Sequence, residues 1–415
     1  MLENYEIKDD IFVNEVNKII KIYKDKDRKY RSNHPIYLLR AFLPLHFKLD
    51  NFLTDIDNAA DLWKFADSQH EHRFFKCLNI LKKVSSDELL MLEKVSKKFG
   101  DTQRIFNRPT NPVGINQQLS SIPTLRIVSS LEKKKGKKLK ILEIGGGTGM
   151  LGHMCEVLGH QYFNFEVTQS FYIFNSIFCR KMHKNNFFDL GVDIENVNND
   201  ILINSQKSVN LIPWWIFLNK NVSIPDIDVF VINHSFYEIS PLAIKFILSR
   251  ASYGRKEKAQ LIVSHWGSPN HTKINEKLKK EIENKFNFNL ESFEGHTDVN
   301  PIGTILISFK KNEQFSNEKI INPIKVKSNK EYSHFSIKKI LGKFLEIFKN
   351  KIFDKKYVIG DNQPKIINNP KIKETYTKDL TDVIELVNSL EDYFKKPVCT
   401  EDEVNSLFTD HNKHI

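Results

Sequence analysis

The chain has 415 residues, 40% of them hydrophobic and 11% aromatic, which is enough apolar material for one large packed domain or for two to three smaller ones. The formal net charge of +11 raises the question of a nucleic acid partner. Most of that charge comes from lysine, however, and arginine is the side chain that forks onto phosphates and guanine edges. We therefore expect no nucleic acid binding.

Cysteine usage and hydropathy bear on the cellular compartment. The four cysteines, Cys77, Cys155, Cys179 and Cys399, are scattered and show no C-x-x-C spacing. No apolar run approaches the length of a membrane span, and the opening MLENYEIKDD has neither the basic nor the apolar region of a signal peptide. These features predict a cytoplasmic protein with reduced thiols.

Residues 1–110 are predicted to be mostly helical. Apolar residues recur at three- and four-residue spacing in IFVNEVNKIIKIY and in SSDELLMLEKVSKKFG. The second of these segments opens with Ser and Asp as cap candidates and is expected to end at Gly100. The next segment, residues 107–124, reads NRPTNPVGINQQLSSIPT and is rich in Pro, Asn and Gly, which predicts a loop.

From residue 138 the period of the apolar pattern changes. Short apolar runs (KLKILEIGG, YFNFEV, VNLIPWWIF, DVFVINH, QLIVSHW) alternate with helix candidates such as GMLGHMCEVLG, SPLAIKFILSR and NEKLKKEIENKF. This alternation predicts an α/β fold, a Rossmann-like parallel sheet with helices on both faces. The last two runs, FNFNLESFEG and GTILISFKK, are joined by a loop too short for a crossover helix, so we expect an antiparallel last strand.

The organisation weakens after residue 312. Residues 336–353, SIKKILGKFLEIFKNKIF, predict a basic amphipathic helix, and an acidic helix, TKDLTDVIELVNSLEDYF, follows later. The basic helix either packs against the rest of the chain or a second subunit, or lies peripherally on anionic lipid at the inner membrane. The expected domains are a helical region at 1–110, a ligand-binding domain at 111–312 and an extension at 313–415.

The most unusual stretch is EIGGGTGMLGH, residues 143–153, between an apolar run and a helix candidate. A strand that enters a glycine turn and then a helix presents backbone N–H groups and a helix N-terminus to a ligand. Gly147 to Gly152 match G-x-G-x-x-G, with Glu166 at the distance of a ribose-binding acid, so a nicotinamide or flavin dinucleotide is one interpretation. A turn that serves only tight packing is another.

Glu143 argues against a dinucleotide, because its carboxylate would face a pyrophosphate across a short gap. S-adenosylmethionine has no phosphate and carries a sulfonium and an ammonium, which an acid in the turn favours. The spacing of Glu143 and the glycines resembles the turn of class I methyltransferases, and that resemblance implies that Glu166 binds the ribose hydroxyls. The candidate cofactor residues are Glu143, Gly145, Gly146, Gly147, Thr148, Gly149, Glu166 and Asn233.

A second motif, NHSFYE at residues 233–238, follows an apolar strand. With the glycine turn, it resembles the sugar O-methyltransferases of bacterial surface-glycan gene clusters over about residues 105–312. The chain departs from that pattern at Ile239, where the family has Met, and at Glu166-Val167-Thr168, where it has Asp-Leu-Pro. The resemblance implies methyl transfer from S-adenosylmethionine to a sugar hydroxyl of a surface polysaccharide or its precursor.

A sugar hydroxyl needs a base to accept its proton, placed at the carboxyl ends of the strands. The candidates are His234, His265, His296 in the expected loop GHTDVNP, and Glu238, as base or as the group that orients a histidine. His153 is expected to be a packing residue. Asp200 either reaches the adenine or lies in a turn. His296 and Asp298 are too common a pair to indicate a metal, so none is predicted.

Three alternatives to sugar methylation are retained: methylation of a non-sugar hydroxyl or amine, a dinucleotide-binding oxidoreductase, and a non-enzymatic scaffold. The aromatic residues Trp214, Trp215, Phe217 and Trp266 either stack on sugar rings or belong to the core, and the core is favoured. The N-terminal helices are expected to supply a cap over the substrate.

Overall fold

The computed structural model describes residues 10–31, 42, 55–68, 80, 84–105, 113–219, 221–236, 260–266, 290–299 and 302–309, with a few further positions between 239 and 283. The predictions for Glu238 and for residues 313–415, including 336–353, fall outside this described part. No helix within it combines the length and the apolar character needed to cross a bilayer.

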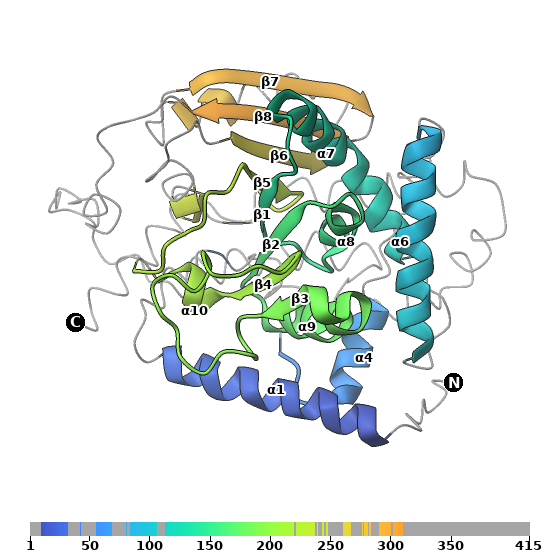
Figure 1. Cartoon of the computed structure of the whole chain (residues 1–415), viewed down its shortest axis with the longest axis vertical. Coiled ribbons are helices and arrows are strands. Elements are labelled where there is room, and N and C mark those ends of the chain that lie inside the picture. The colour runs from blue at the N-terminus through green and yellow to red at the C-terminus, as the bar shows by residue number, and fades with distance from the viewer. Residues whose placement is uncertain are drawn as a thin grey trace, which may run out of the picture.

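An eight-stranded sheet runs through the molecule in the order β3-β4-β2-β1-β5-β6-β8-β7 (Figure 1). The strands are β1 (Lys140–Ile144), β2 (Gln161–Glu166), β3 (Phe187–Asp189), β4 (Val209–Pro213), β5 (Val229–Asn233), β6 (Gln260–Trp266), β7 (Leu290–Val299) and β8 (Ile302–Phe309). The first six strands in this order (β3, β4, β2, β1, β5 and β6) are parallel to one another. β8 is antiparallel to β6, and β7 is antiparallel to β8. The predicted α/β fold, a mainly parallel sheet with an antiparallel last strand, is confirmed.

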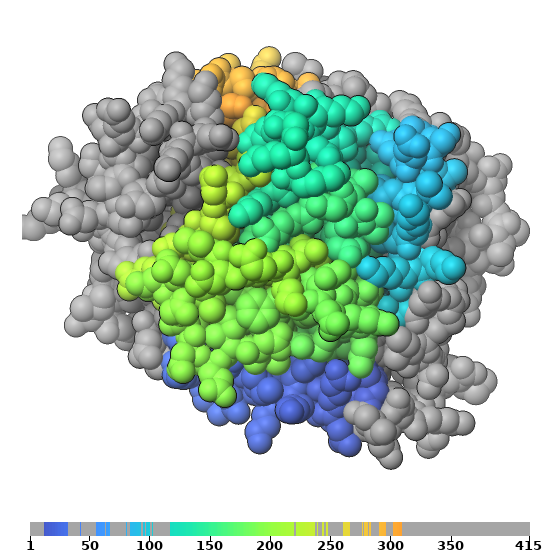
Figure 2. All heavy atoms as spheres, viewed as in Figure 1, coloured from blue at the N-terminus to red at the C-terminus, as the bar shows by residue number. Residues whose placement is uncertain are grey.

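One face of the sheet is covered by α7 (Val113–Lys135), α8 (Met150–Val157) and α9 (Gln169–His183). The N-terminal helices α1 (Asp10–Arg31), α4 (Ala59–Ser68) and α6 (Ser86–Ile105) pack mainly on these helices and on α10 (Trp214–Phe217). Figure 2 shows α1 along the base of the molecule and α6 on its flank. All of these elements contribute to one continuous hydrophobic core, so the described N-terminal helices share their core with the sheet.

The helical prediction for the N-terminal region is confirmed for the described residues. At the start of α6, Ser85 and Glu88 form a capping box, with Ser85 N donating to Glu88 Oε2 at 2.8 Å and Glu88 N to Ser85 Oγ at 3.3 Å. The helix passes Gly100, where we expected it to end, because the residues beyond it continue to pack: Thr102 is buried and its hydroxyl bonds Lys98 O.

The loop predicted for residues 107–124 is wrong from Val113 onward, where α7 begins. Pro123 lies inside this helix, although proline lacks the N–H that would bond the carbonyl four residues earlier. Burial outweighs that penalty, because the helix places an apolar stripe on its neighbours: Leu119, Ile122, Leu125, Val128 and Leu131 are all buried. Composition favoured a loop, and tertiary packing made a helix.

The expected loop around His296 is also wrong, because this residue lies in β7 opposite Thr304. The whole GHTDV segment is part of the strand, because Gly295, His296 and Val299 pair with β8, with a shift of register between His296 and Val299. The sequence analysis did not predict β3, a strand of three residues at the other edge of the sheet.

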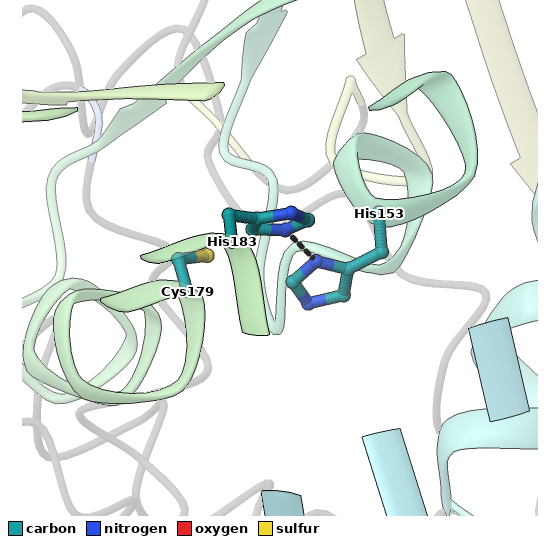
Figure 3. Close-up of side chains that lie close together, drawn as sticks. All are labelled: His153, Cys179 and His183. Atoms are coloured by element: carbon teal, nitrogen blue, oxygen red, sulfur yellow. Dashed lines mark hydrogen bonds between the residues drawn. The ribbon is translucent and has the colours of Figure 1, made fainter. Parts of the chain in front are cut away.

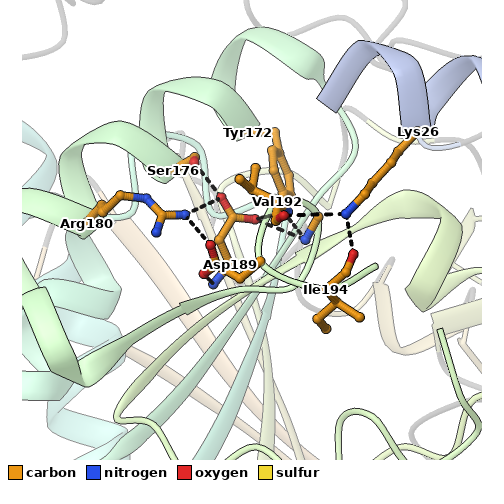
Figure 4. A network of polar contacts seen from close by, with 9 residues as sticks. Lys26, Tyr172, Ser176, Arg180, Asp189, Val192 and Ile194 are labelled. Carbon is orange, nitrogen blue, oxygen red and sulfur yellow. Dashed lines mark hydrogen bonds and ion pairs between the residues drawn. The ribbon is translucent and has the colours of Figure 1, made fainter. Parts of the chain in front are cut away.

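The β3 edge is tied to α9 and α1 through Asp189, which is fully buried (Figure 4). Its carboxylate accepts hydrogen bonds from Tyr172 Oη, Ser176 Oγ and the backbone N–H of Gly191. Beside this network, Lys26 of α1 donates to the carbonyls of the loop that follows β3. The first helix of the described chain is therefore fastened to the sheet edge by polar contacts as well as by packing.

The amino ends of the strands are held by Asp228, which precedes β5. Its carboxylate accepts the backbone N–H of Lys140 at 2.9 Å and pairs with Lys135 at 3.0 Å and Lys137 at 2.9 Å. Burial opposes ionisation of this carboxyl group, but the N–H and the two lysines outweigh burial and hold its pKa below the usual value. This end of the sheet therefore contains a satisfied, ionised acid.

Candidate functional site

The order of the strands locates a crevice. β1 lies between β2 and β5, so the chain winds outward in both directions from β1. In open α/β sheets, ligands bind beyond the carboxyl ends of the strands at such a switch point. The glycine turn occupies this position, because it follows β1 directly and leads into α8 through Gly149, which has a φ of 77°.

Glycine is required in this turn for two different physical reasons. A Cβ atom at Gly146 would lie 2.5 Å from Asn164 Oδ1, one at Gly149 would meet Asn175, and one at Gly152 would enter the ring of Tyr162. These three glycines are required by packing within the chain.

Gly147 is different, because a Cβ atom there would meet nothing closer than Phe171 Cε1 at 3.9 Å. Its φ of 56° still requires glycine, as does the φ of 68° at Gly145. Among the glycines of the turn, Gly147 is therefore the one least covered by described side chains, and we expect a ligand to approach the backbone there. Thr148, next to it, is buried.

Glu166, at the end of β2, holds the turn from the opposite side. Its Oε1 accepts the backbone N–H groups of Val167 and Thr168, each at 2.8 Å, and its Oε2 accepts that of Gly147 at 3.2 Å. The Thr168 side chain also donates a hydrogen bond to this carboxylate. Burial raises the pKa of Glu166 to about 7, against the effect of the three N–H groups and the Thr168 side chain.

Glu143, the acid of β1, is buried beneath α8 and accepts the hydroxyl of Tyr162. Burial is the largest cause that raises its pKa, to about 8, and the charge of Glu166 adds to the effect. The sequence argument assumed an ionised carboxylate. In the structure this carboxyl group is mostly protonated at neutral pH until a cation approaches it.

Asn233 ends β5 and turns toward α7. Its Oδ1 accepts the hydroxyl of Thr124 at 3.3 Å, and its Nδ2 donates to Ser121 Oγ at 3.1 Å. We expected this residue to contact a cofactor, and that stays a prediction. In the structure its amide bonds α7, so Asn233 also positions that helix beside the carboxyl end of β5.

A row of polar positions crosses the sheet from Asn233. Asn233 pairs in register with Ser264, Ser264 with Thr304, and Thr304 with position 296. The side chains of Ser264 and Thr304 are fully buried, and neither hydroxyl has a hydrogen-bond partner among the described residues. The sequence analysis missed both residues. Their only signal is a polar residue within an apolar strand, and the register was needed to align them.

The candidate bases are distributed over different environments. His234, directly after β5, is half-buried and has a φ of 67°, a conformation that is strained for any residue but glycine. Its Nε2 lies 3.3 Å from Ser120 O, so Nε2 carries the proton and Nδ1 is the acceptor nitrogen. His265 is buried in β6, and because it neighbours Ser264 it lies on the opposite face of the sheet. The structure does not bring these two histidines to the same face.

An N-terminal helix packs on a side chain beside the glycine turn. Phe65 of α4 packs edge-on against Phe171 of α9, with ring centroids 4.9 Å apart, and Phe171 is the nearest described side chain to a Cβ atom placed on Gly147. The role of the N-terminal helices as a cap stays a prediction.

The remaining sequence predictions divide clearly. Trp214, Trp215 and Phe217 are buried in α10, and Trp214 Nε1 donates to Asp27 at 2.7 Å, so the core interpretation is confirmed for these three. Asp200 is an exposed turn residue, which excludes the strand-end interpretation. His153 is buried against His183, as a packing residue would be.

No protein-family model and no curated protein matches this chain. Among solved structures it is similar to the magnesium protoporphyrin IX methyltransferase ChlM of Synechocystis PCC 6803 with bound SAH, at 10% identity and a TM-score of 0.29 over 46% of this chain and 85% of that one. It is also similar to the Burkholderia thailandensis 1,6-didemethyltoxoflavin-N1-methyltransferase, at 10% identity and a TM-score of 0.31 over 46% and 79% of the two chains.

A third likeness is to the pyocyanin biosynthetic protein PhzM, at 9% identity and a TM-score of 0.32 over 48% of this chain and 59% of that one. Likeness at this level carries no argument about the activity of this chain. The function has to be argued from the site itself.

Proposed function

We propose that this chain is an S-adenosylmethionine-dependent O-methyltransferase that acts on a sugar hydroxyl of a bacterial surface polysaccharide or its precursor. The observation that carries the proposal is the glycine turn. A Cβ atom at Gly147 would meet only Phe171 among the described residues, at 3.9 Å, while Glu143 and Glu166 are buried beside the turn, and neither pairs with a lysine or arginine within the described residues. A cationic ligand would lower the raised pKa values of these acids and gain their negative charge, whereas a pyrophosphate would raise the pKa values further. This favours S-adenosylmethionine over the dinucleotide alternative.

The residues around the turn divide the binding of this cofactor. The backbone of Gly145, Gly146, Gly147, Thr148 and Gly149 lies against the methionine part and the ribose. Glu166, whose Oε2 accepts the N–H of Gly147, is the acid that we assign to the ribose hydroxyls. Glu143 loses its proton when the sulfonium and ammonium approach, and it then stabilises their charge.

Methyl transfer is an in-line displacement in which the sugar oxygen forms a bond to the methyl carbon as the carbon–sulfur bond breaks. S-adenosylhomocysteine leaves, and the hydroxyl proton passes to a base. We assign this role to His234, whose acceptor nitrogen is Nδ1 and whose strained backbone lies at the end of β5. His265, His296 and Glu238 are the alternatives.

Ligand binding tests the cofactor assignment. S-adenosylhomocysteine should raise the melting temperature of the full chain and bind with micromolar affinity or better, whereas NAD should have no effect. Protection by NAD alone would identify an oxidoreductase and refute the proposal. Protection by neither ligand would leave the scaffold alternative.

Alanine variants test the base at saturating cofactor. His234→Ala should lower kcat by about 100-fold or more while S-adenosylhomocysteine still binds, because a positioned base contributes roughly 10²- to 10⁴-fold. His265→Ala, His296→Ala and Glu238→Ala are compared in the same assay, because these residues are the alternative bases. Full activity in His234→Ala would transfer the role to another of the candidates. A screen of sugar and non-sugar acceptors then decides the substrate class.

The domain limits remain proposals: a methyltransferase domain at 111–312, a helical cap at 1–110 and an extension at 313–415. Residues 336–353 would suit an acceptor linked to lipid if they contact an anionic membrane, and co-sedimentation with anionic vesicles tests this. Binding that weakens with salt and is lost when 336–353 are deleted supports membrane contact. No binding at low salt supports packing.

A further inference from the structure

A second group of chemically active side chains lies behind the glycine turn, between the two helices that begin there. His153 of α8 and Cys179 and His183 of α9 are all buried, and one potential ligand atom of each lies within 4.8 Å of the others (Figure 3). Cys179 and His183 are four residues apart, so they share one face of α9. The proposed methyl transfer uses none of the three.

We propose that His153, Cys179 and His183 form a binding site for a divalent transition-metal ion, with Zn²⁺ as the best match. One thiolate and two imidazoles are a donor set that Zn²⁺ prefers, whereas Mg²⁺ and Ca²⁺ prefer oxygen donors. This inference does not depend on the proposed activity, because the site is a property of α8 and α9 alone.

The geometry of the histidine pair supports the assignment. His153 Nδ1 and His183 Nε2 lie 2.7 Å apart, and both rings are buried. These are the two nitrogens that would bind the metal, and an ion between them would replace the single proton that the two neutral imidazoles share.

The surroundings of His183 also fit a ligand. Its Nδ1 lies 3.6 Å from Glu156 Oε2, which resembles the carboxylate–histidine arrangement that orients metal-bound imidazoles. Nε2 of His183 then faces the metal position.

Two adjustments accompany binding. Two imidazole nitrogens on a tetrahedral Zn²⁺ are about 3.3 Å apart, so the histidine pair must open by about 0.6 Å, which small side-chain rotations allow. Lys98 Nζ, now 3.4 Å from His183 Nδ1, keeps its 3.1 Å contact with Glu156. The Cys179 thiol releases its proton to solvent as the sulfur–metal bond forms, and no electron transfer is involved.

Metal analysis of the full chain tests the site. After removal of metals with EDTA, Zn²⁺ added to the wild type should be retained at about one ion per chain through gel filtration. Co²⁺ in its place should give an intense near-ultraviolet band from thiolate-to-cobalt charge transfer. Failure to retain Zn²⁺, or a Co²⁺ spectrum without the thiolate band, would overturn the proposal and leave the histidine pair as a packing contact.

A matched pair of cysteine variants identifies the ligand. Cys155 of α8 is buried and free like Cys179, but it is not part of the cluster. Cys179→Ser should lose the thiolate band and most of the Zn²⁺, whereas Cys155→Ser should keep both, with folding checked by near-ultraviolet circular dichroism. A thiolate band that survives in Cys179→Ser contradicts the assignment. Because S-adenosylhomocysteine plays no part in this readout, its result is independent of the proposed activity.

Discussion

The two ends of the parallel sheet contain buried acids in opposite situations. At the amino ends, Asp228 pairs with two lysines and its pKa is lowered. At the carboxyl ends, Glu143 and Glu166 have no such partner within the described residues, and burial raises their pKa values to about 8 and about 7. An acid that is paired within the chain stabilises the fold, whereas an acid buried without a cation costs stability unless a ligand supplies the charge. The contrast separates a structural end from a binding end.

The largest expected effect is on ligand affinity, and it comes from substituting one turn glycine at each end of the sheet. Gly147→Val should weaken binding of S-adenosylhomocysteine by at least about 100-fold, because the new side chain fills the position where the ligand meets the backbone. Gly136, before β1, has a φ of 64° and also faces open space, so Gly136→Val imposes similar strain at the amino end. It should lower stability to a similar degree and leave affinity unchanged, as calorimetric titration can show. Equal loss of binding in both variants would contradict the contrast.

Removal of the acid at the carboxyl ends of the strands should change ligand affinity, whereas removal of the acid at the amino ends should change stability. Glu166→Ala should weaken the binding of S-adenosylhomocysteine by about 1.5–3 kcal/mol, the scale of a hydrogen bond to a charged group. It also leaves three N–H groups without their acceptor, so some stability is lost as well.

Asp228→Ala should lower the free energy of unfolding by about 2 kcal/mol, because Lys135 and the backbone N–H of Lys140 lose a buried acceptor, and the ligand affinity should stay the same. Urea unfolding and titration of both variants measure the two quantities. A change of affinity in Asp228→Ala would show that the two ends are coupled.

Stability should respond to pH with opposite signs at the two ends. The pKa of Glu143 is higher in the folded state than in the unfolded state, so its ionisation in the folded protein costs stability. The contribution of Glu143 to the free energy of unfolding therefore falls as the pH rises from about 5 to about 8. The lowered pKa of Asp228 means that its contribution is lost only in acid, below the usual aspartate range. Glu143→Gln, which can still accept the Tyr162 hydroxyl, should flatten the decline between pH 5 and 8 by at least about 1 kcal/mol. An unchanged slope would mean that Glu143 is already ionised without a ligand.

The smallest expected effect concerns the charge of the ligand. S-adenosylmethionine has a sulfonium that S-adenosylhomocysteine lacks, and it should therefore draw the proton from Glu143. The ratio of the two affinities should shift toward S-adenosylmethionine a few-fold between pH 6.5 and 8.5, and Glu143→Gln should abolish this shift. A ratio independent of pH in the wild type would place the sulfonium away from Glu143.

Periodicity and short motifs were sufficient to predict most of the sheet, because its strands other than β3 and the end of β7 are apolar runs. β6, for example, has the limits expected from QLIVSHW. They failed at α7, where Pro123 and neighbouring polar residues indicated a loop and only the burial of Leu119 and Val128 explains the helix. Local composition cannot report a packing partner that lies elsewhere in the chain.

The site was predicted only in part, because a local motif identifies the turn but not the side chains that other segments bring to it. The turn and its two acids are local in sequence, so EIGGGTG identified them. Other features depend on contacts between segments that are distant in sequence. They are the hydrogen bonds of Asn233 to α7, the position of His265 on the opposite face of the sheet from Ser264, and the packing of Phe65 near the turn. His153 was predicted to be a packing residue, and its juxtaposition with Cys179 could not be read from a spacing of 26 residues across two helices.

The docking of α1 has a consequence for how the protein is made. Trp214 donates to Asp27 across 187 residues of chain, and Tyr23 packs on Tyr172 and Trp215. At ribosomal rates of 5–20 residues per second, the first helix emerges roughly 10–40 s before the surface that receives its apolar face. During that interval Tyr23, Ile20 and Val16, all buried in the finished fold, have no native partner on the later segments. Nascent α1 is therefore a segment that a chaperone would hold, and slower translation would prolong that exposure.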